Sequence, residues 1–146
     1  MPALRLARTF GFAILALSSL LILAGCAGLA GDTARERALL PALRSAWPGV
    51  AADVQRGVND GLDDGDLTAA ASDALVASAD HLGVSLSSTL EDAKTVTGVE
   101  WPVLHAWAAR GVIDRVDDGE IGPGVAVSLN ERILQFDAAI DALQGR

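Results

Sequence analysis

The chain has 146 residues and a formal net charge of −8, from 11 basic and 19 acidic residues. Hydrophobic residues make up 51% of it, which is enough for one domain with its own core. The acidic balance disfavours nucleic acid as a partner, because phosphate binding depends on Lys and Arg that displace counterions. The chain has a single cysteine, Cys26, so it cannot form an internal disulfide.

The first 30 residues are organised like an export signal. Arg5 and Arg8 form a short basic segment, and an uncharged apolar run from Gly11 to Ala24 follows them. The arginines would stay on the cytoplasmic side while the apolar run enters the membrane as a helix. A permanent transmembrane anchor is the alternative, because the chain is uncharged from Phe10 to Ala30 and about 20 apolar residues suffice to cross a bilayer.

Four residues at the end of this run favour export with cleavage. They are a branched apolar residue, two small residues and the cysteine, in the order Leu23, Ala24, Gly25 and Cys26. This order resembles the lipobox of bacterial lipoproteins, and all four positions match it. The resemblance covers residues 1 to about 26, and beyond them we recognise no family motif.

The resemblance implies that the lipoprotein signal peptidase cleaves between Gly25 and Cys26. Cys26 then becomes the first residue, its thiol carries a diacylglycerol, and its amino group is usually acylated. Several acyl chains are needed because a buried methylene contributes only about 0.8 kcal/mol, so one chain holds a protein marginally. Residues 1–25 are thus the expected signal peptide, residues 26–32 a flexible lipidated tether, and residues 33–146 an acidic helical domain.

The expected location is a membrane of the bacterial cell envelope. Cleavage would leave 121 residues in which 9 basic residues face 19 acidic ones, a net charge of −10. Anionic lipid repels such a domain, so the anchor alone would attach it. In lipoproteins of Gram-negative bacteria an Asp after the cysteine is the usual inner-membrane retention signal, and here that residue is Ala27. We therefore expect the periplasmic face of the outer membrane if the host has one.

Beyond the tether, apolar residues recur at spacings of three and four, which predicts an all-α fold. Pro41 and Pro48 interrupt the first stripe, so we expect a short helix near Thr33 to Ala46 and a second helix that starts at Pro48. The stripe comprises Leu43, Trp47, Val50, Val54, Val58 and Leu62.

Two further helices are expected in the middle of the chain. The first runs from Leu67 to about Thr95, and small or polar residues at its centre favour a bend or a break there, namely Gly83, Ser85, Ser87 and Ser88. The second opens near Pro102 and ends near Val116. Trp101 and Trp107 bring most of its aromatic bulk to the core, and an exposed groove around them is the candidate partner surface.

Two acidic segments resemble each other at a distance of 54 residues. Asp60 to Leu67 reads DGLDDGDL, and Asp114 to Ile121 reads DRVDDGEI. Such self-similarity indicates either a duplicated helical hairpin or the same turn used twice. In both segments an aliphatic residue would close one helix, and Gly65 or Gly119 would take the left-handed conformation that ends it.

The same segments raise the alternative of a calcium-responsive module. With Gly65 or Gly119 at position six of an EF-hand loop, position three is aliphatic in both copies. Position twelve is then Ala71 or Val125, where a bidentate Glu is needed. The EF-hand pattern fails twice, and we expect no metal site.

The last helix is expected from about Val125 to Leu143. Its apolar positions follow steps of four, three, four and three, and they are Leu129, Ile133, Phe136, Ile140 and Leu143. This stripe predicts a face packed in the core, and a partner-binding surface is the alternative.

The sequence offers little for catalysis. The two histidines, His81 and His105, lie 24 residues apart without zinc-site spacing, and no serine lies in a Gly-x-Ser-x-Gly elbow. The loop Gly122 to Gly124 has no lysine after it, so it does not match a phosphate-binding loop. We therefore expect no enzyme activity and no cofactor besides the acyl chains on Cys26.

Together these features predict an all-α, antiparallel bundle of about four helices. We expect it to act as a binding or structural module that is attached to a membrane and contacts another envelope protein. A calcium-responsive module and an envelope hydrolase are the alternatives. A phage or prophage origin is a further hypothesis, which rests only on the size and type of the protein.

Overall fold

The computed structural model describes residues 30–146, which form four α-helices and, within that range, no strand. The helices are α2 (Ala30–Asp63), α3 (Ala69–Ser85), α4 (Leu90–Asp117) and α5 (Pro123–Gln144). Residues 36–146 belong to one compact unit. The expected all-α fold of about four helices is confirmed. The expected signal peptide, the lipobox and Cys26 lie outside the described residues.

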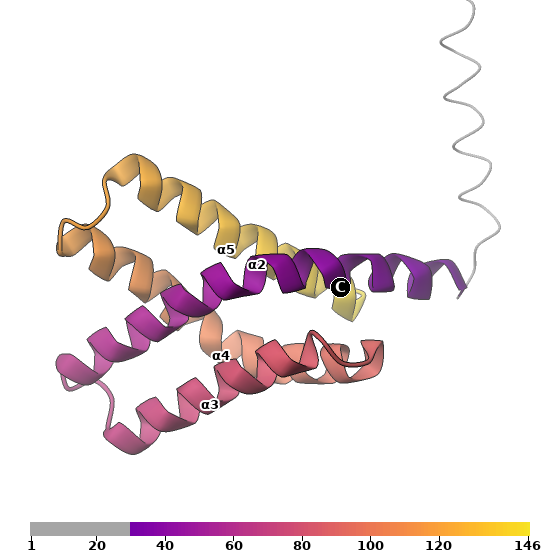
Figure 1. The fold of residues 1–146 in the computed structure, drawn as a ribbon, viewed down its shortest axis with the longest axis horizontal. Coiled ribbons are helices and arrows are strands. Elements are labelled where there is room, and N and C mark those ends of the chain that lie inside the picture. The colour runs from indigo at the N-terminus through magenta and orange to yellow at the C-terminus, as the bar shows by residue number, and fades with distance from the viewer. Residues whose placement is uncertain (1–29) are drawn as a thin grey trace, which may run out of the picture. The chain divides into compact units, whose positions relative to one another are not determined.

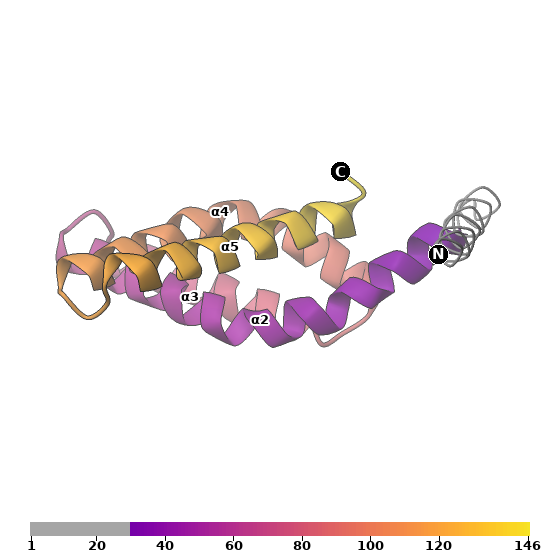
Figure 2. The ribbon, with the colours of Figure 1, turned by 90° about the horizontal axis from the view of Figure 1, so that it is seen from above.

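The helices form two hairpins that pack against each other (Figures 1 and 2). We call residues 36–85, from α2 and α3, hairpin 1, and residues 90–144, from α4 and α5, hairpin 2. The turn within each hairpin lies at the same end of the unit, on the left in Figure 1. Residues 86–89 connect the hairpins near the other end, where Lys94 Nζ lies 3.0 Å from Glu36 Oε1.

Helix α2 contradicts the expected break between Ala46 and Pro48, because it continues through both Pro41 and Pro48. Each proline leaves the carbonyl four residues earlier without its helical N–H donor. Both prolines are exposed, so water can hydrogen-bond those carbonyls, and α2 is bent in Figure 2. Buried residues on either side of the prolines keep the helix continuous by packing into one core.

The middle of the chain divides differently from the expected helices. The segment from Leu67 to Thr95 breaks at its weak centre, where α3 ends at Ser85 and the hydroxyl of Thr89 caps α4 by accepting from the backbone N–H of Asp92. The expected helix start at Pro102 is wrong, because α4 runs through this exposed proline from Leu90 to Asp117. Tertiary packing outweighs one lost backbone hydrogen bond there.

The core lies between the two hairpins and draws on all four helices. The α5 stripe is a core face, as expected: Leu129 is half-buried and the other four residues are buried. The remaining buried apolar residues are Leu40, Leu43, Val50, Val54, Val58, Leu82, Leu86, Ala93, Trp101, Leu104, Ala108 and Val112.

α2 begins at Ala30, inside the segment 26–32 that the sequence predicts as a tether. None of the four described helices is both long enough and apolar enough to cross a membrane.

Candidate functional site

The two acidic segments form the same turn. We call residues 60–67 the first acidic turn and residues 114–121 the second acidic turn. Gly65 and Gly119 have φ of 78° and 72°, the left-handed conformation that ends a helix. The N–H of Leu67 donates to Gly61 O at 2.9 Å, and the N–H of the equivalent Ile121 donates to Arg115 O at 3.2 Å. The expected turn mechanism is confirmed in both copies.

Each acidic turn is held by an arginine from the other hairpin. Arg110 of hairpin 2 binds three carboxylates of the first acidic turn, with Nη1 2.7 Å from Asp66, Nη2 2.9 Å from Asp64 and Nε bonded to Asp60. Its guanidinium carbon also lies 5.6 Å from the ring centroid of Trp107. The chain therefore supplies its own cation to this turn.

Arg56 of hairpin 1 binds the second acidic turn in the equivalent way. It donates to Asp114 and Asp118, and its Nη2 lies 3.0 Å from Glu120 Oε1. Arg56 precedes Asp60 by four residues, and Arg110 precedes Asp114 by four residues. An approximate two-fold axis therefore relates the two hairpins: it places the arginine of each hairpin on the acidic turn of the other.

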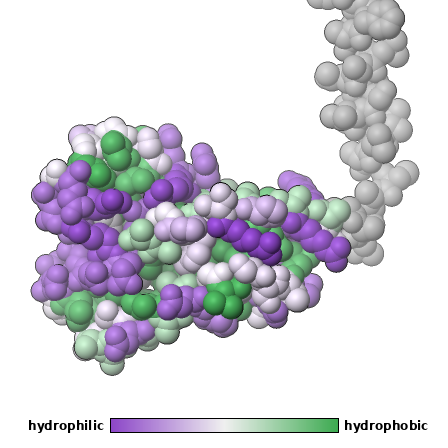
Figure 3. Space-filling view, in the orientation of Figure 1, coloured by the Kyte–Doolittle hydropathy of each residue, from purple (hydrophilic) through white to green (hydrophobic). Residues whose placement is uncertain are grey.

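These contacts keep both guanidinium groups charged. The hydrogen bonds to Asp60 and then Asp66 raise the pKa of Arg110 above its ordinary value, although partial desolvation opposes them. The hydrogen bond to Asp114 does most to raise the pKa of Arg56. Hydrophilic side chains cover much of this end of the unit in Figure 3.

Helices α2 and α4 cross at Gly57 and Gly111, which the same approximate two-fold axis relates. A Cβ on Gly57 would overlap the carbonyl oxygen of Trp107 and lie 2.8 Å from the backbone N of Gly111. A Cβ on Gly111 would overlap the carbonyl oxygen of Asp53 and lie 2.8 Å from the backbone N of Gly57. Only residues without a side chain allow the two backbones this close approach.

The duplication extends beyond the two acidic turns that short motifs indicate. Residues 47–67 and 101–121 align with a shift of 54 and are identical at ten of 21 positions. The shared residues include the Trp-Pro pairs that begin both segments and the Arg-Gly-Val triplets that precede the acidic turns. Comparing the chain with itself at this shift would have found them. The structure therefore supports a duplicated hairpin over a turn that merely occurs twice.

Two pairs of equivalent positions carry residues of different chemistry in the two halves. Asp53 is fully buried in hairpin 1, where its carboxylate binds Arg115 Nη1 at 3.1 Å and Arg132 Nη2 at 2.5 Å. The position equivalent to Asp53 is Trp107, and the position equivalent to Arg115 is Gly61. Trp107 packs on Gly61, where a Cβ would lie 2.6 Å from its ring. Of the two related places in the interface, one thus has an ion pair and the other has an aromatic contact.

An unusual polar atom belongs to this ion-pair cluster. Arg132 Nε is buried and, within the described part of the chain, has no hydrogen-bond partner, although Nη2 of the same side chain also donates to Gly49 O at 3.1 Å. A buried ion pair costs desolvation that an apolar contact avoids. The contact of Trp107 with Gly61 fills the equivalent place in the same fold without buried charges. The stability of the fold therefore does not by itself explain the ion pair of Asp53.

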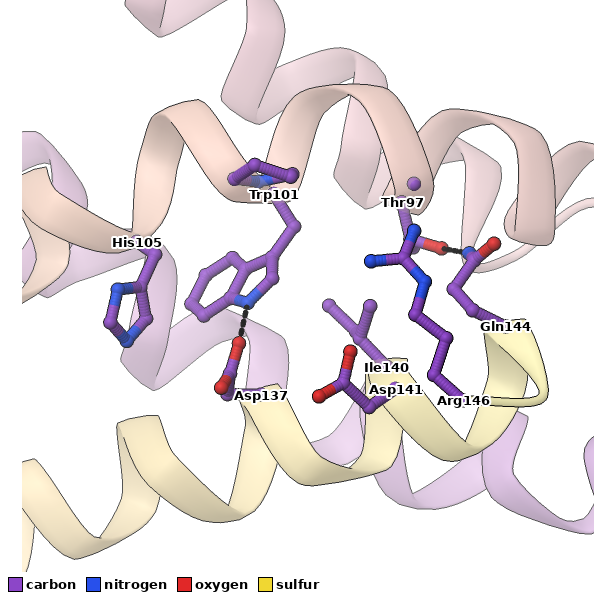
Figure 4. A pocket seen from close by; sticks show the side chains of 10 residues that line it. Thr97, Trp101, His105, Asp137, Ile140, Asp141, Gln144 and Arg146 are labelled. Carbon is purple, nitrogen blue, oxygen red and sulfur yellow. Dashed lines mark hydrogen bonds between the residues drawn. The ribbon is translucent and has the colours of Figure 1, made fainter.

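A shallow pocket between α4 and α5 contains one of the two histidines (Figure 4). His105 packs edge-on against Trp101, with ring centroids 5.4 Å apart. Trp101 Nε1 donates to Asp137 Oδ1 at 2.7 Å, and Gln144 Nε2 donates to Thr97 Oγ1 at 3.0 Å. Most polar side chains in this pocket therefore already bind each other across the two helices.

The structure separates the residues that sequence reasoning grouped as candidates. Trp101 is only 2% exposed, which corrects its assignment to an exposed partner surface, while Trp107 is half-buried beneath Arg110. His81 lies on α3 and contacts Glu100 Oε1 at 3.3 Å, whereas His105 contacts Trp101. Among the described residues, no group of three or more His, Cys, Asp or Glu side chains is arranged to hold a metal ion.

The outer side of α4 exposes apolar residues that sequence reasoning did not select. Val99, Val103 and Ile113 are 65%, 52% and 58% exposed. The equivalent positions of α2 are Ser45, Gly49 and Asn59. Because α2 occupies the related place in the fold with small or polar residues, the fold does not require apolar residues there.

No family model matches the chain, and no curated protein and no solved structure matches it either.

Proposed function

We propose that the protein is a lipid-anchored component of the bacterial cell envelope whose helical domain binds another envelope protein and performs no catalysis. The observation that carries the anchor is the Leu23-Ala24-Gly25-Cys26 order at the end of an uncharged run and behind two arginines. Cys26 lies four residues before Ala30, where α2 begins.

Two features of the domain support a binding module. Its acidic turns are engaged by Arg56 and Arg110, which favours a bracing role for these charges over a calcium-dependent one. The outer side of α4 presents Val99, Val103 and Ile113, which the related side of α2 lacks. These three exposed apolar residues mark the surface that we propose for the protein partner, since their removal from water favours association.

Targeting is tested with Cys26→Ala in cells fed labelled palmitate. We expect the substitution to abolish labelling and to prevent the mobility shift that accompanies signal cleavage. Ala27→Ser is the matched control, because it leaves all four lipobox positions intact and should label normally. Persistent labelling of the Cys26→Ala protein would refute lipidation at this residue.

The partner surface is tested with a photo-crosslinking residue at position 113 or position 59, which are equivalent positions on α4 and α2. We expect a specific crosslinked product in the native envelope from position 113 and none from position 59. Equal products from both positions, or none from position 113, would contradict the assignment of the partner surface to α4 and leave the anchor unaffected.

A further inference from the structure

The interface between the two hairpins is built from contacts that occur in related pairs. Arg56 binds the second acidic turn and Arg110 binds the first. Gly57 and Gly111 approach each other's helix backbones. The arginine, the glycine and the acidic turn that hairpin 1 presents to hairpin 2 are thus equivalent to those that hairpin 2 presents to hairpin 1, as in an interface between identical partners.

Each hairpin also has contacts within itself. In hairpin 1 the indole of Trp47 packs on Gly83, and its ring also lies 5.6 Å from that of Phe136 in hairpin 2. In hairpin 2 the indole of Trp101 donates to Asp137. Positions 47 and 101 are equivalent, as are positions 83 and 137. Each hairpin can therefore keep its internal contacts while its partner hairpin is replaced.

The connection between the hairpins is short and has ordinary backbone angles. Leu86 is still helical, with φ −60° and ψ −22°, and Thr89 is extended, with φ −76° and ψ 162°. Residues 87–89 are exposed and include neither glycine nor proline. A helical conformation at these residues would join α3 to α4 and carry hairpin 2 away from hairpin 1.

We propose that two copies of this chain associate by exchanging hairpins, so that hairpin 1 of each copy docks on hairpin 2 of the other. Every contact across the interface is then made again between chains, and the segment 86–89 is the hinge. Exchange of identical elements is an accessible route to a dimer because it requires no new surface.

The unlike positions in the two halves determine which hairpins can pair. If hairpin 1 docked on a second hairpin 1, buried Asp53 would face Gly61 and lose Arg115. If hairpin 2 docked on a second hairpin 2, Trp107 would meet Arg115 where it now needs Gly61. An unpaired buried charge or an overfilled contact disfavours both, so exchange keeps unlike hairpins together.

Charge-reversed variants of the full-length chain in mild detergent test the exchange. In the R56E variant, the negative charge introduced at position 56 lies against the carboxylates of the second acidic turn. In the D114R/D118R variant, the positive charges introduced in that turn lie against Arg56. Like charges therefore repel each other across the hairpin interface within each variant chain. In an exchanged dimer of the two variants, the negative charge introduced at position 56 would meet the positive charges introduced at positions 114 and 118. At the other interface of that dimer, Arg56 would meet the natural carboxylates. Both interfaces become complementary only if the chains trade hairpins.

We expect the two variants, unfolded and refolded together, to form mainly a species that native mass spectrometry identifies as one copy of each. Its Tm should exceed that of either variant refolded alone. The matched control R56E/D114R/D118R restores the pairing for one chain and for two identical chains, so it should regain the Tm of the unsubstituted protein. A mixture that contains no mixed dimer, or a control that stays as unstable as the single variants, would overturn the proposal.

The hinge provides a second, independent measurement with the interface left intact. Replacing Ser87, Ser88 and Thr89 by alanine favours a continuous helix and removes the cap of α4, so the dimer fraction should rise. Replacing Ser87 and Ser88 by glycine disfavours that helix and should lower the fraction. Equal dimer fractions in both variants would contradict a hinge at these residues.

Discussion

Gly57 and Gly111 meet where α2 crosses α4, and each lies against backbone atoms of the other helix. The two glycines occupy equivalent positions of a duplicated hairpin, so one contact is made twice. Its geometry sets the distance between the helices, and that distance lets Arg56 and Arg110 reach the opposite acidic turns.

Alanine at either glycine should force α2 and α4 apart. We expect Gly57→Ala and Gly111→Ala each to lower the free energy of unfolding by about 3 kcal/mol, because the added methyl would overlap a backbone carbonyl that cannot rotate away. Urea denaturation measures this change. Gly124→Ala is the control, since its Cβ would point into open space in α5 and alanine loses less backbone freedom on folding than glycine does. A similar loss of stability in all three variants would argue against the glycine crossing.

The two cross-hairpin arginines should contribute equally because their surroundings are related. We expect Arg56→Ala and Arg110→Ala to lower Tm by similar amounts, and high salt to reduce both effects because the pairs are partly exposed. Arg37→Ala, an exposed change elsewhere on α2, should leave Tm nearly constant. Thermal scans in low and high salt provide the comparison, and a salt-independent loss would indicate packing by the side-chain stems in place of ion pairing.

Loss of the buried carboxylate should be more costly than loss of an exposed one. Asp53→Ala leaves Arg115 and Arg132 facing each other without their shared carboxylate, and we expect a loss of about 3 kcal/mol. Asp63→Ala removes an exposed carboxylate near the end of the same helix and should change stability little. Chemical denaturation measures the free energy of unfolding of the two variants. Similar losses in both would contradict this prediction.

The start of α4 should contribute to acid sensitivity. Hydrogen bonds from Ser88 and then Thr89 lower the pKa of Asp92 below its ordinary value of 3.8. A carboxyl whose pKa is lower in the folded state stabilises the fold above pH 3.8, and this contribution disappears as the pH falls through the folded-state pKa. Asp92→Asn should therefore lower Tm at neutral pH, with a difference that shrinks on acidification. Glu91→Gln, a substitution of an exposed neighbour, serves as the control. If the Tm difference caused by Asp92→Asn did not depend on pH, the stability of the fold would not be coupled to the protonation of Asp92.

Local sequence patterns predicted much of the fold. Residues 125–143 carry a continuous stripe without proline, and their helix and its buried face were found almost to the residue. Gly65 and Gly119 were assigned to left-handed turns because the surrounding acidic and aliphatic residues suit a helix end. Proline positions were misread at Pro41, Pro48 and Pro102, because local propensity cannot include the packing that holds a helix together across them.

The sequence alone determined the helical class, the two related turns and the four residues that resemble a lipobox, since each depends on neighbours in the chain. Only the tertiary structure decided what the acidic turns contact. Arg56 and Asp114 are 58 residues apart in the chain, and Gly57 and Gly111 are 54 residues apart. Such pairs depend on how two hairpins dock, and docking is set by close backbone approach and by buried charges such as Asp53, which no local spacing records.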